Sequence, residues 1–229
     1  MLKKYISKKS IFYKPYLFFR IFWLEKIFIK RKTYSQCGED IFIKKFFQDY
    51  PKGKYLDIGA FNPIKYNNTY LLYLMGWSGT NIDLNQTSID LFNIVRPQDT
   101  NICAAISDKN EKVEVHIENI FSPLNTISKN FSKNLSMGKK KVNSYFIETK
   151  KINDIVKDKF DFLNIDIEGM DLKVLKSIDL SYYKPKLVCL EIFDQKSFAE
   201  LEKYLLNFNY IYVMKFGPSY FFKLKTKND

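Results

Sequence analysis

The sequence is poor in the residues that build metal clusters and disulfide frameworks. Its 229 residues include one histidine and three cysteines, and Cys37, Cys103 and Cys189 lie far apart with no CxxC pair among them. These counts argue against a zinc cluster and against a set of structural disulfides. They favour a protein of the reducing cytoplasm.

Glycine-rich loops and long apolar runs are also missing. None of the eight glycines forms a GxGxxG motif, so a dinucleotide-binding loop is excluded. The most apolar stretch, near the N-terminus, is interrupted by Arg20, Glu25 and Lys26 and has no small-residue cleavage site, so we expect neither a spanning helix nor a signal peptide. The hydrophobic content of 46% argues against disorder, and the length suits about one domain.

Positive charge is concentrated at the N-terminus. The formal net charge is +12, but residues 1–33 contain ten Lys and Arg and one Glu, which leaves 27 basic and 24 acidic residues elsewhere. The nearly neutral remainder, which also lacks a DPPY-like or NPPY-like motif, disfavours a nucleic-acid partner. We therefore predict a basic, aromatic N-terminal segment over 1–33 and one domain over 34–229.

A helix is expected in the N-terminal segment, from Tyr16 to Ile29. It would group aromatic side chains beside basic ones, a pattern typical of helices on an anionic membrane surface: Phe18, Phe19, Phe22, Trp23 and Phe28. The alternative is a helix that packs onto its own domain or onto a partner. Peripheral contact with the inner face of a membrane and a homodimer both remain open.

Strand-like and helix-like segments alternate through the domain. Strands are expected at about 54–58, 79–83, 101–106, 144–149, 160–166, 186–193, 210–216 and 220–225, with helices at about 67–75, 86–95, 151–157, 171–178 and 196–207. Residues 112–117 read as an edge strand or hairpin arm, and 122–143 as a long loop or lid. This order predicts an α/β, Rossmann-like fold with a mostly parallel seven-stranded sheet, helices on both faces and an antiparallel strand in a C-terminal hairpin.

The stretch 54–85 has the layout of a nucleotide-binding βαβ unit. Its first strand ends in Asp57 and is followed by Gly59, which allows a sharp turn beside a ligand. The second strand ends in Asp83, where an acid can accept hydrogen bonds from a ribose diol. A cofactor with ribose and adenine but no pyrophosphate fits this unit, and S-adenosylmethionine is the obvious one.

Four blocks together resemble the FkbM-type methyltransferase family. They are YSQCGED at 34–40, YLDIGAFNPIKYNNT at 55–69, GWSGTNID at 76–83 and FLNIDIEGMDLKVLK at 162–176. The resemblance runs from Tyr34 to the C-terminus and implies a class I methyltransferase fold, S-adenosylmethionine as methyl donor and O-methylation of sugars or other hydroxylated metabolites. Asp83 stands where many relatives have Glu, which shortens its reach to the ribose.

The resemblance also implies which residues bind the donor. Asp57 and Gly59 would lie beside its methionine end, and Asp83 would hold the ribose hydroxyls. The remaining donor-binding candidates are Asn62, Asn68, Thr69 and Asp166 near the pocket, Ala104, Ala105 and Ser107 beside adenine, and Gln36 and Glu39 at the start of a further helix, which we expect Ser35 to cap. A strand-end cap is the alternative role for Asp57, and helix capping is the alternative for Gln36 and Glu39.

The candidate catalytic groups are acids at the ends of adjacent strands. Asp166 and Glu168 lie at the end of one strand, and Glu191 ends the next. One of them could take a proton from an acceptor hydroxyl, or Asp166 and Glu191 could hold a divalent ion such as Mg²⁺. Hydrogen bonds to loops are the alternative. His116, the only histidine, is another candidate base, although it would equally suit a solvated face of an edge strand.

These features predict a cytoplasmic, S-adenosylmethionine-dependent O-methyltransferase. The expected acceptor is a sugar hydroxyl in a nucleotide-sugar or a surface-glycan precursor, as in the biosynthesis of polysaccharides such as capsule or lipopolysaccharide. Two alternatives remain: a methyltransferase of phosphorylated or nitrogen-containing metabolites, and a non-catalytic scaffold.

Overall fold

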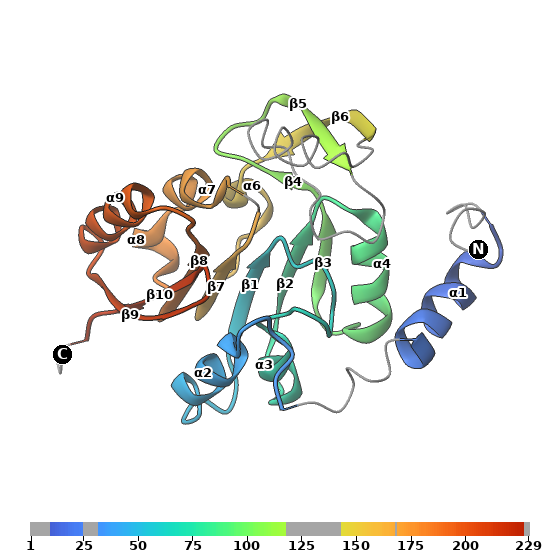
Figure 1. Ribbon diagram of the computed structural model, residues 1–229, viewed down its shortest axis with the longest axis horizontal. Coiled ribbons are helices and arrows are strands. Elements are labelled where there is room, and N and C mark those ends of the chain that lie inside the picture. The colour runs from blue at the N-terminus through green and yellow to red at the C-terminus, as the bar shows by residue number, and fades with distance from the viewer. Residues whose placement is uncertain (1–9, 25–31, 118–142, 168, 227–229) are drawn as a thin grey trace.

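A computed structural model describes residues 10–24, 32–117, 143–167 and 169–226. Its central sheet has seven strands in the order β3-β2-β1-β7-β8-β10-β9 (Figure 1). The strands are β1 (Lys54–Ile58), β2 (Ser78–Asp83), β3 (Thr100–Cys103), β7 (Phe162–Ile165), β8 (Leu187–Glu191), β9 (Tyr210–Phe216) and β10 (Ser219–Leu224). The first five in this order are parallel, and β10 is antiparallel to both of its neighbours. The predicted fold class is confirmed.

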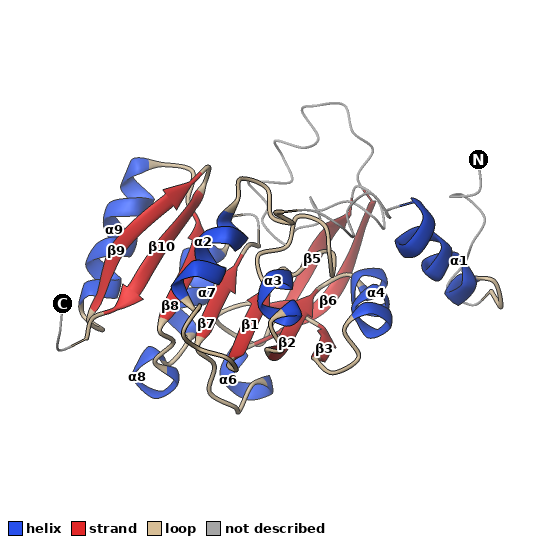
Figure 2. Ribbon diagram, turned by 90° about the horizontal axis from the view of Figure 1, so that it is seen from below, coloured by secondary structure: helices blue, strands red, loops and turns tan. Residues whose placement is uncertain are grey.

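Helices cover both faces of the sheet (Figure 2). Along the chain they are α2 (Glu39–Phe46), α3 (Tyr70–Leu74), α4 (Gln86–Val95), α6 (Ile152–Ile155), α7 (Asp171–Ser177), α8 (Leu180–Tyr183) and α9 (Gln195–Leu206). Successive strand residues point to opposite faces, so Tyr55 packs with α2 and α3 while Leu56 packs with α6 to α9. The short helix α8 was not predicted, and α3 is shorter than predicted.

Two predicted strands were wrong in their placement. Residues 101–106 do not form one buried strand: β3 is a partly exposed edge strand because it pairs only with β2, and β4 (Ala105–Ile106) belongs to another sheet. Residues 144–149 do not continue the main sheet either. They lie in β6 (Asn143–Lys150), at the centre of a small sheet with the order β4-β6-β5.

The small sheet lies at the carboxyl edge of the main sheet (Figure 1). Its strand β4 follows β3 after a single residue, Ala104, whose N–H donates to the Asp83 carbonyl. Its outer strand β5 (Lys112–Ile117) pairs antiparallel with β6, which confirms the predicted hairpin arm. The predicted lid at 122–143 lies outside the described residues except for its last position.

The described residues of the N-terminal segment form α1 (Tyr13–Phe19), which continues as the π-helix η2 (Arg20–Leu24). The helix therefore starts earlier than the predicted Tyr16, and the predicted end at Ile29 lies outside the described residues. Tyr13, Leu17 and Ile21 are buried against the domain. No helix in the described ranges is both long and apolar enough to cross a membrane.

Gly59 lets the end of β1 approach the end of β7 closely. Its φ is +81°, and a Cβ there would overlap the Asp166 carbonyl oxygen. Gly76 has a similar φ of +89° but no atom within 4 Å of a Cβ. Gly59→Ala and Gly76→Ala would both strain the backbone, because both positions have a positive φ. Only Gly59→Ala would also bring a Cβ into overlap with a neighbouring atom.

We expect Gly59→Ala to lower the free energy of unfolding by about 1–3 kcal/mol more than Gly76→Ala, since a side chain forced into a packed site displaces its neighbours. Urea unfolding of the two variants measures the difference. Equal losses in both variants would show that the contact with Asp166 has no energetic weight.

Candidate active site

A polar pocket opens at the carboxyl ends of β1, β7 and β8. The predicted site residues that line it are Gln36, Glu39, Asp57, Gly59, Asn68, Asp166 and Glu191. Ala60, Tyr66, Asn67, Asn164 and Ser219 complete the lining. Five predicted donor-binding residues and the two acids Asp166 and Glu191, which are also predicted catalytic residues, therefore line the same pocket.

Hydrogen bonds to Asp57 connect the chain segments that form this pocket. Its side chain is 1% exposed, and the Asn164 amide donates to Oδ1 at 2.8 Å. Thr69 Oγ1 and Asn67 Nδ2 donate to Oδ2 at 2.9 and 3.2 Å. Burial raises the pKa of Asp57, while these three hydrogen bonds and the charge of Arg96 oppose that shift. Asp57 therefore links β7 to the loop between β1 and α3, which is more than capping the end of β1.

Arg96 is hydrogen-bonded to the same loop, between β1 and α3. The side chain is fully buried, and its guanidinium donates to Thr69 Oγ1 at 2.8 Å, to Asn67 Oδ1 at 2.7 Å and to the Pro63 carbonyl. It also lies over the rings of Tyr70 and Phe92. Nothing in the sequence indicates this role, because a single arginine at the end of a helix is usually solvated.

Asp83 ends β2 as predicted, and both of its carboxylate oxygens accept backbone hydrogen bonds. Phe61 N–H donates to Oδ2 at 2.9 Å, and Asn85 N–H donates to Oδ1 at 2.7 Å. Burial raises the pKa of Asp83 to about 6. Each oxygen retains a second lone pair that could accept from a ribose hydroxyl. Burial raises the pKa of Tyr145 of β6, a residue that the sequence did not indicate, and the nearby Cys103 and Asp83 add to that shift.

Most of the other predicted donor-binding residues are buried or hydrogen-bonded to other residues of the protein. Asn62 Oδ1 accepts from the N–H groups of Ile64 and Lys65, and so shapes the turn after β1. Ala105 and Ser107 are buried in and beside β4. Thr69 is fully buried, and its hydroxyl donates a hydrogen bond to Asp57.

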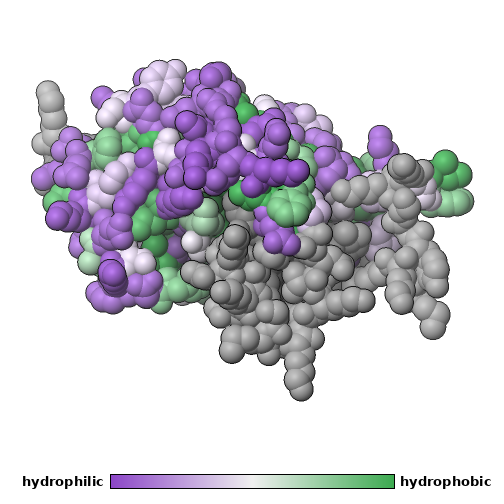
Figure 3. Space-filling model, turned by 90° about the horizontal axis from the view of Figure 1, so that it is seen from above, coloured by the Kyte–Doolittle hydropathy of each residue, from purple (hydrophilic) through white to green (hydrophobic). Residues whose placement is uncertain are grey.

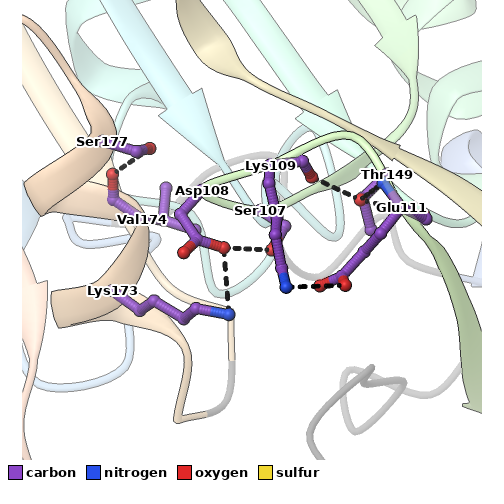
Figure 4. Close-up of polar contacts among 8 residues, drawn as sticks. All are labelled: Ser107, Asp108, Lys109, Glu111, Thr149, Lys173, Val174 and Ser177. Carbon is purple, nitrogen blue, oxygen red and sulfur yellow. Dashed lines mark hydrogen bonds and ion pairs between the residues drawn. The ribbon is translucent and has the colours of Figure 1, made fainter.

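The Ser107 hydroxyl takes part in a polar cluster between the small sheet and α7 (Figure 4). It donates to Asp108 Oδ1 at 3.0 Å, and the same oxygen forms an ion pair with Lys173 of α7 at 2.9 Å. Lys109 pairs with Glu111, and the Thr149 hydroxyl donates to the Lys109 carbonyl. Ser107 thus contributes to the attachment of the small sheet.

Glu39 lies at the start of α2 and at the pocket, so donor binding by it stays a prediction, and its side chain does not cap the helix. It begins α2 and is 2% exposed, its Oε2 accepts from Cys37 N–H at 2.7 Å, and it also lines the pocket. Ser219 Oγ donates to its Oε1 at 3.4 Å. Gln36 lines the pocket from the preceding turn.

Asp171 fixes the segment that carries two predicted catalytic acids. It is 2% exposed, and its carboxylate accepts from Ile167 N–H and Gly169 N–H at 3.3 and 3.2 Å. The Glu191 N–H also donates to it. Asp166 and Glu191 are thereby placed at neighbouring strand ends, as predicted, whereas Glu168 lies outside the described residues. Asp171 is a site-organising residue that sequence reasoning missed.

The remaining catalytic and metal predictions are only partly covered. His116 lies in β5 opposite Ser144, within the small sheet, but its side chain is outside the described part of the structure. Among the described residues, no group of three or more His, Cys, Asp or Glu side chains is arranged to hold a metal ion. Metal binding by Asp166 and Glu191 therefore stays a prediction.

The buried acids give the fold an unusual dependence on pH. Burial raises the pKa of Asp171 to about 7, against about 3.9 for an unfolded Asp. Between about pH 4 and pH 7 the Asp171 carboxyl therefore binds more protons in the folded than in the unfolded state, so the contribution of this group to stability falls as the pH rises, by up to about 1.4 kcal/mol per pH unit.

We expect Asp171→Asn to flatten this decline in urea unfolding measured across that pH range. Asp158→Asn is the control, because Asp158 is exposed and its pKa is lowered by Lys54, so its proton binding changes at lower pH. A slope in Asp171→Asn as steep as in the unmodified protein would contradict the assignment.

The pocket residues fit the cationic end of S-adenosylmethionine. Glu39, Asp57, Asp166 and Glu191 line the pocket, and no Lys or Arg of the described residues does. The same four carboxylates help burial to raise the pKa of the Cys189 thiol well above its usual value. Such a negative field suits an ammonium and a sulfonium group. Asp83 lies at the adjacent strand end, where a ribose would follow.

Comparison with known proteins agrees with this geometry. The family model described as the methyltransferase FkbM domain matches residues 57–212. None of the curated proteins matches the chain.

Two solved structures are similar to the chain. The methyltransferase FkbM from Methylobacillus flagellatus KT has 17% identity and a TM-score of 0.48; the match covers 76% of this chain and 44% of that one. The chain thus spans less than half of that protein's length. A TehB-like SAM-dependent methyltransferase from Corynebacterium glutamicum ATCC 13032 Kitasato has 12% identity and a TM-score of 0.48, with 90% and 96% covered. By the match over residues 57–212, which is more than half of its length, the chain belongs to the FkbM methyltransferase family.

Proposed function

We propose that the protein methylates a hydroxyl oxygen of a sugar, in a nucleotide-sugar or a surface-glycan precursor. The observation that supports oxygen as the acceptor atom is the pair of acids at neighbouring strand ends: Asp166 after β7 and Glu191 at the end of β8 both line the donor pocket. A hydroxyl group is a weak nucleophile until a base accepts its proton, and a carboxylate at the pocket can do so.

In the proposed reaction Asp166 accepts the hydroxyl proton as the acceptor oxygen forms its bond to the methyl carbon. The bond between that carbon and sulfur breaks, and S-adenosylhomocysteine leaves. S-adenosylmethionine supplies the electrophilic methyl group on a sulfonium sulfur. The rest of the chain contributes alignment: Asp171 accepts from the Ile167 N–H beside Asp166 and from the Glu191 N–H, and Asp57 with Asn67 and Asn164 shapes the pocket.

The sugar part of the proposal is supported by the family resemblance, which implies hydroxylated acceptors. It is tested by incubating the full chain with S-adenosylmethionine and panels of nucleotide-sugars, phosphorylated metabolites and amines, followed by mass spectrometry of the products. We expect a gain of one methyl group on a sugar oxygen. Methylation confined to nitrogen or phosphate-bearing non-sugar acceptors would replace the proposal with the corresponding alternative, and a protein that binds the donor but methylates none of these would favour a scaffold.

A further inference from the structure

The helix formed by α1 and η2 is apolar on two opposite sides. One side carries Tyr13, Leu17 and Ile21, spaced four residues apart and buried against Ile64, Tyr70, Leu71 and Leu91. Tyr13 also donates to Asp90 of α4 at 2.7 Å. The helix is therefore anchored to the domain by its inner side, beside the helix that follows Asp83.

The outer side, together with the turn before α1, is exposed and rich in aromatic side chains. We call Ile11, Phe12, Phe18, Phe19, Phe22 and Trp23 the aromatic face; each is at least 48% exposed, and Ile11 reaches 84%. Phe18 stacks on Phe22 and Phe19 on Trp23, with ring centroids 6.1 and 6.4 Å apart. Figure 3 shows hydrophobic side chains at the end of the molecule where α1 and η2 lie. Contiguous exposed apolar surface of this kind marks an interaction site.

Charge indicates which partner covers the aromatic face. Ten basic residues and one acidic residue occur in residues 1–33, on both sides of the face in sequence. Two copies of so basic a segment repel each other, which disfavours a symmetric contact between them. An anionic surface is attracted instead, and aromatic rings flanked by Lys and Arg are suited to the headgroup region of a bilayer.

We propose that the aromatic face binds the surface of a bilayer that contains anionic lipids. The two roles considered for this segment then belong to opposite sides of one helix: the inner side docks on the domain, and the outer side docks on lipid. The donor pocket is held near the surface through α4, whose first residue follows Asp83 by three positions.

The test uses the full chain and vesicle flotation, with vesicles of phosphatidylcholine alone and of phosphatidylcholine mixed with phosphatidylglycerol. The variant is Phe22→Ser/Trp23→Ser, and the control is Leu206→Ser, which removes a similarly exposed apolar side chain (60%) at the end of α9. We expect binding to the anionic vesicles only, weakened about tenfold or more in the double variant and unchanged in the control, because two aromatic side chains lose their apolar contact.

Higher salt should weaken the binding because the attraction is partly electrostatic. The double variant should keep the thermal unfolding midpoint and the S-adenosylhomocysteine affinity of the unmodified chain, since its two side chains face away from the domain. Lack of binding to anionic vesicles, equal binding to neutral ones, or unchanged binding by the double variant would each overturn the proposal. So would a dimer in sedimentation that the double variant dissociates, which would make a second copy the occupant.

Discussion

Arg96→Met is expected to lower the free energy of unfolding by about 3–5 kcal/mol. The change removes a buried guanidinium while the Asp57 carboxylate remains buried, and breaking such a charge arrangement from one side is strongly destabilising. Asn67 Oδ1 and the Pro63 carbonyl also lose donors. Urea unfolding at neutral pH measures the loss.

The companion variants show whether the effect comes from the network around Asp57. Asp57→Asn removes the opposite charge, so the double variant Arg96→Met/Asp57→Asn should lose less than the sum of the two single losses. Arg96→Lys keeps the charge but not the planar set of donors, and we expect an intermediate loss. If the two losses of unfolding free energy are strictly additive in the double variant, Arg96 and Asp57 do not act together. A loss below about 1 kcal/mol in Arg96→Met would show that Arg96 contributes no more to stability than an average side chain.

Asp166→Asn is expected to lower the rate of methyl transfer by about 10²–10⁴-fold, the usual contribution of a general base. Affinity for S-adenosylhomocysteine should remain close to that of the unmodified protein, because the amide keeps the size of the carboxylate. The experiment measures turnover, with the acceptor that the panel of candidate acceptors identifies. It also measures the binding of S-adenosylhomocysteine by calorimetry. It rests on the proposed transfer to oxygen.

Controls separate the three roles that the site leaves to Asp166. A parallel loss of turnover and affinity would place Asp166 in donor binding rather than in proton transfer. Inhibition by a chelator in the unmodified chain, restored by Mg²⁺ and absent in Asp166→Asn, would make it a metal ligand. If His116→Ala instead abolishes turnover while Asp166→Asn retains it, His116 is the base.

Much of the fold could be predicted because strand and helix periodicity dominates the domain. The run from Tyr55 to Ile58 is buried on both faces and lies between neighbouring strands on both sides in the sheet, so its largely apolar pattern and its environment agree. The helix at 86–95 has a clear start, where the Asn85 side chain accepts from Thr87 N–H, and its predicted bounds are confirmed. The strand-end acids Asp57, Asp83 and Glu191 were found for the same reason.

The rest depends on contacts between distant parts of the chain. A strand pattern at 144–149 does not say which sheet accepts it, and the small sheet forms because β6 finds β4 and β5. Arg96 and Asp171 look like ordinary surface charges in the sequence, since only the folded chain brings the Thr69 hydroxyl to Arg96 and the Glu191 N–H to Asp171. Gly59 was expected to allow a sharp turn, and its positive φ agrees, but the sequence does not indicate that a Cβ there would also overlap the Asp166 backbone.

Calorimetric titration of S-adenosylhomocysteine tests the central claim, that the carboxyl edge of β1 and β2 is the donor site. The full chain and Asp158→Asn, an exposed control, are expected to bind it. Asp83→Asn should bind about tenfold more weakly or worse, because a carboxylate that accepts from a hydroxyl contributes about 1.5–3 kcal/mol. A folded chain that binds no S-adenosylhomocysteine, or an Asp83→Asn variant that binds it as tightly as the control, would contradict the account.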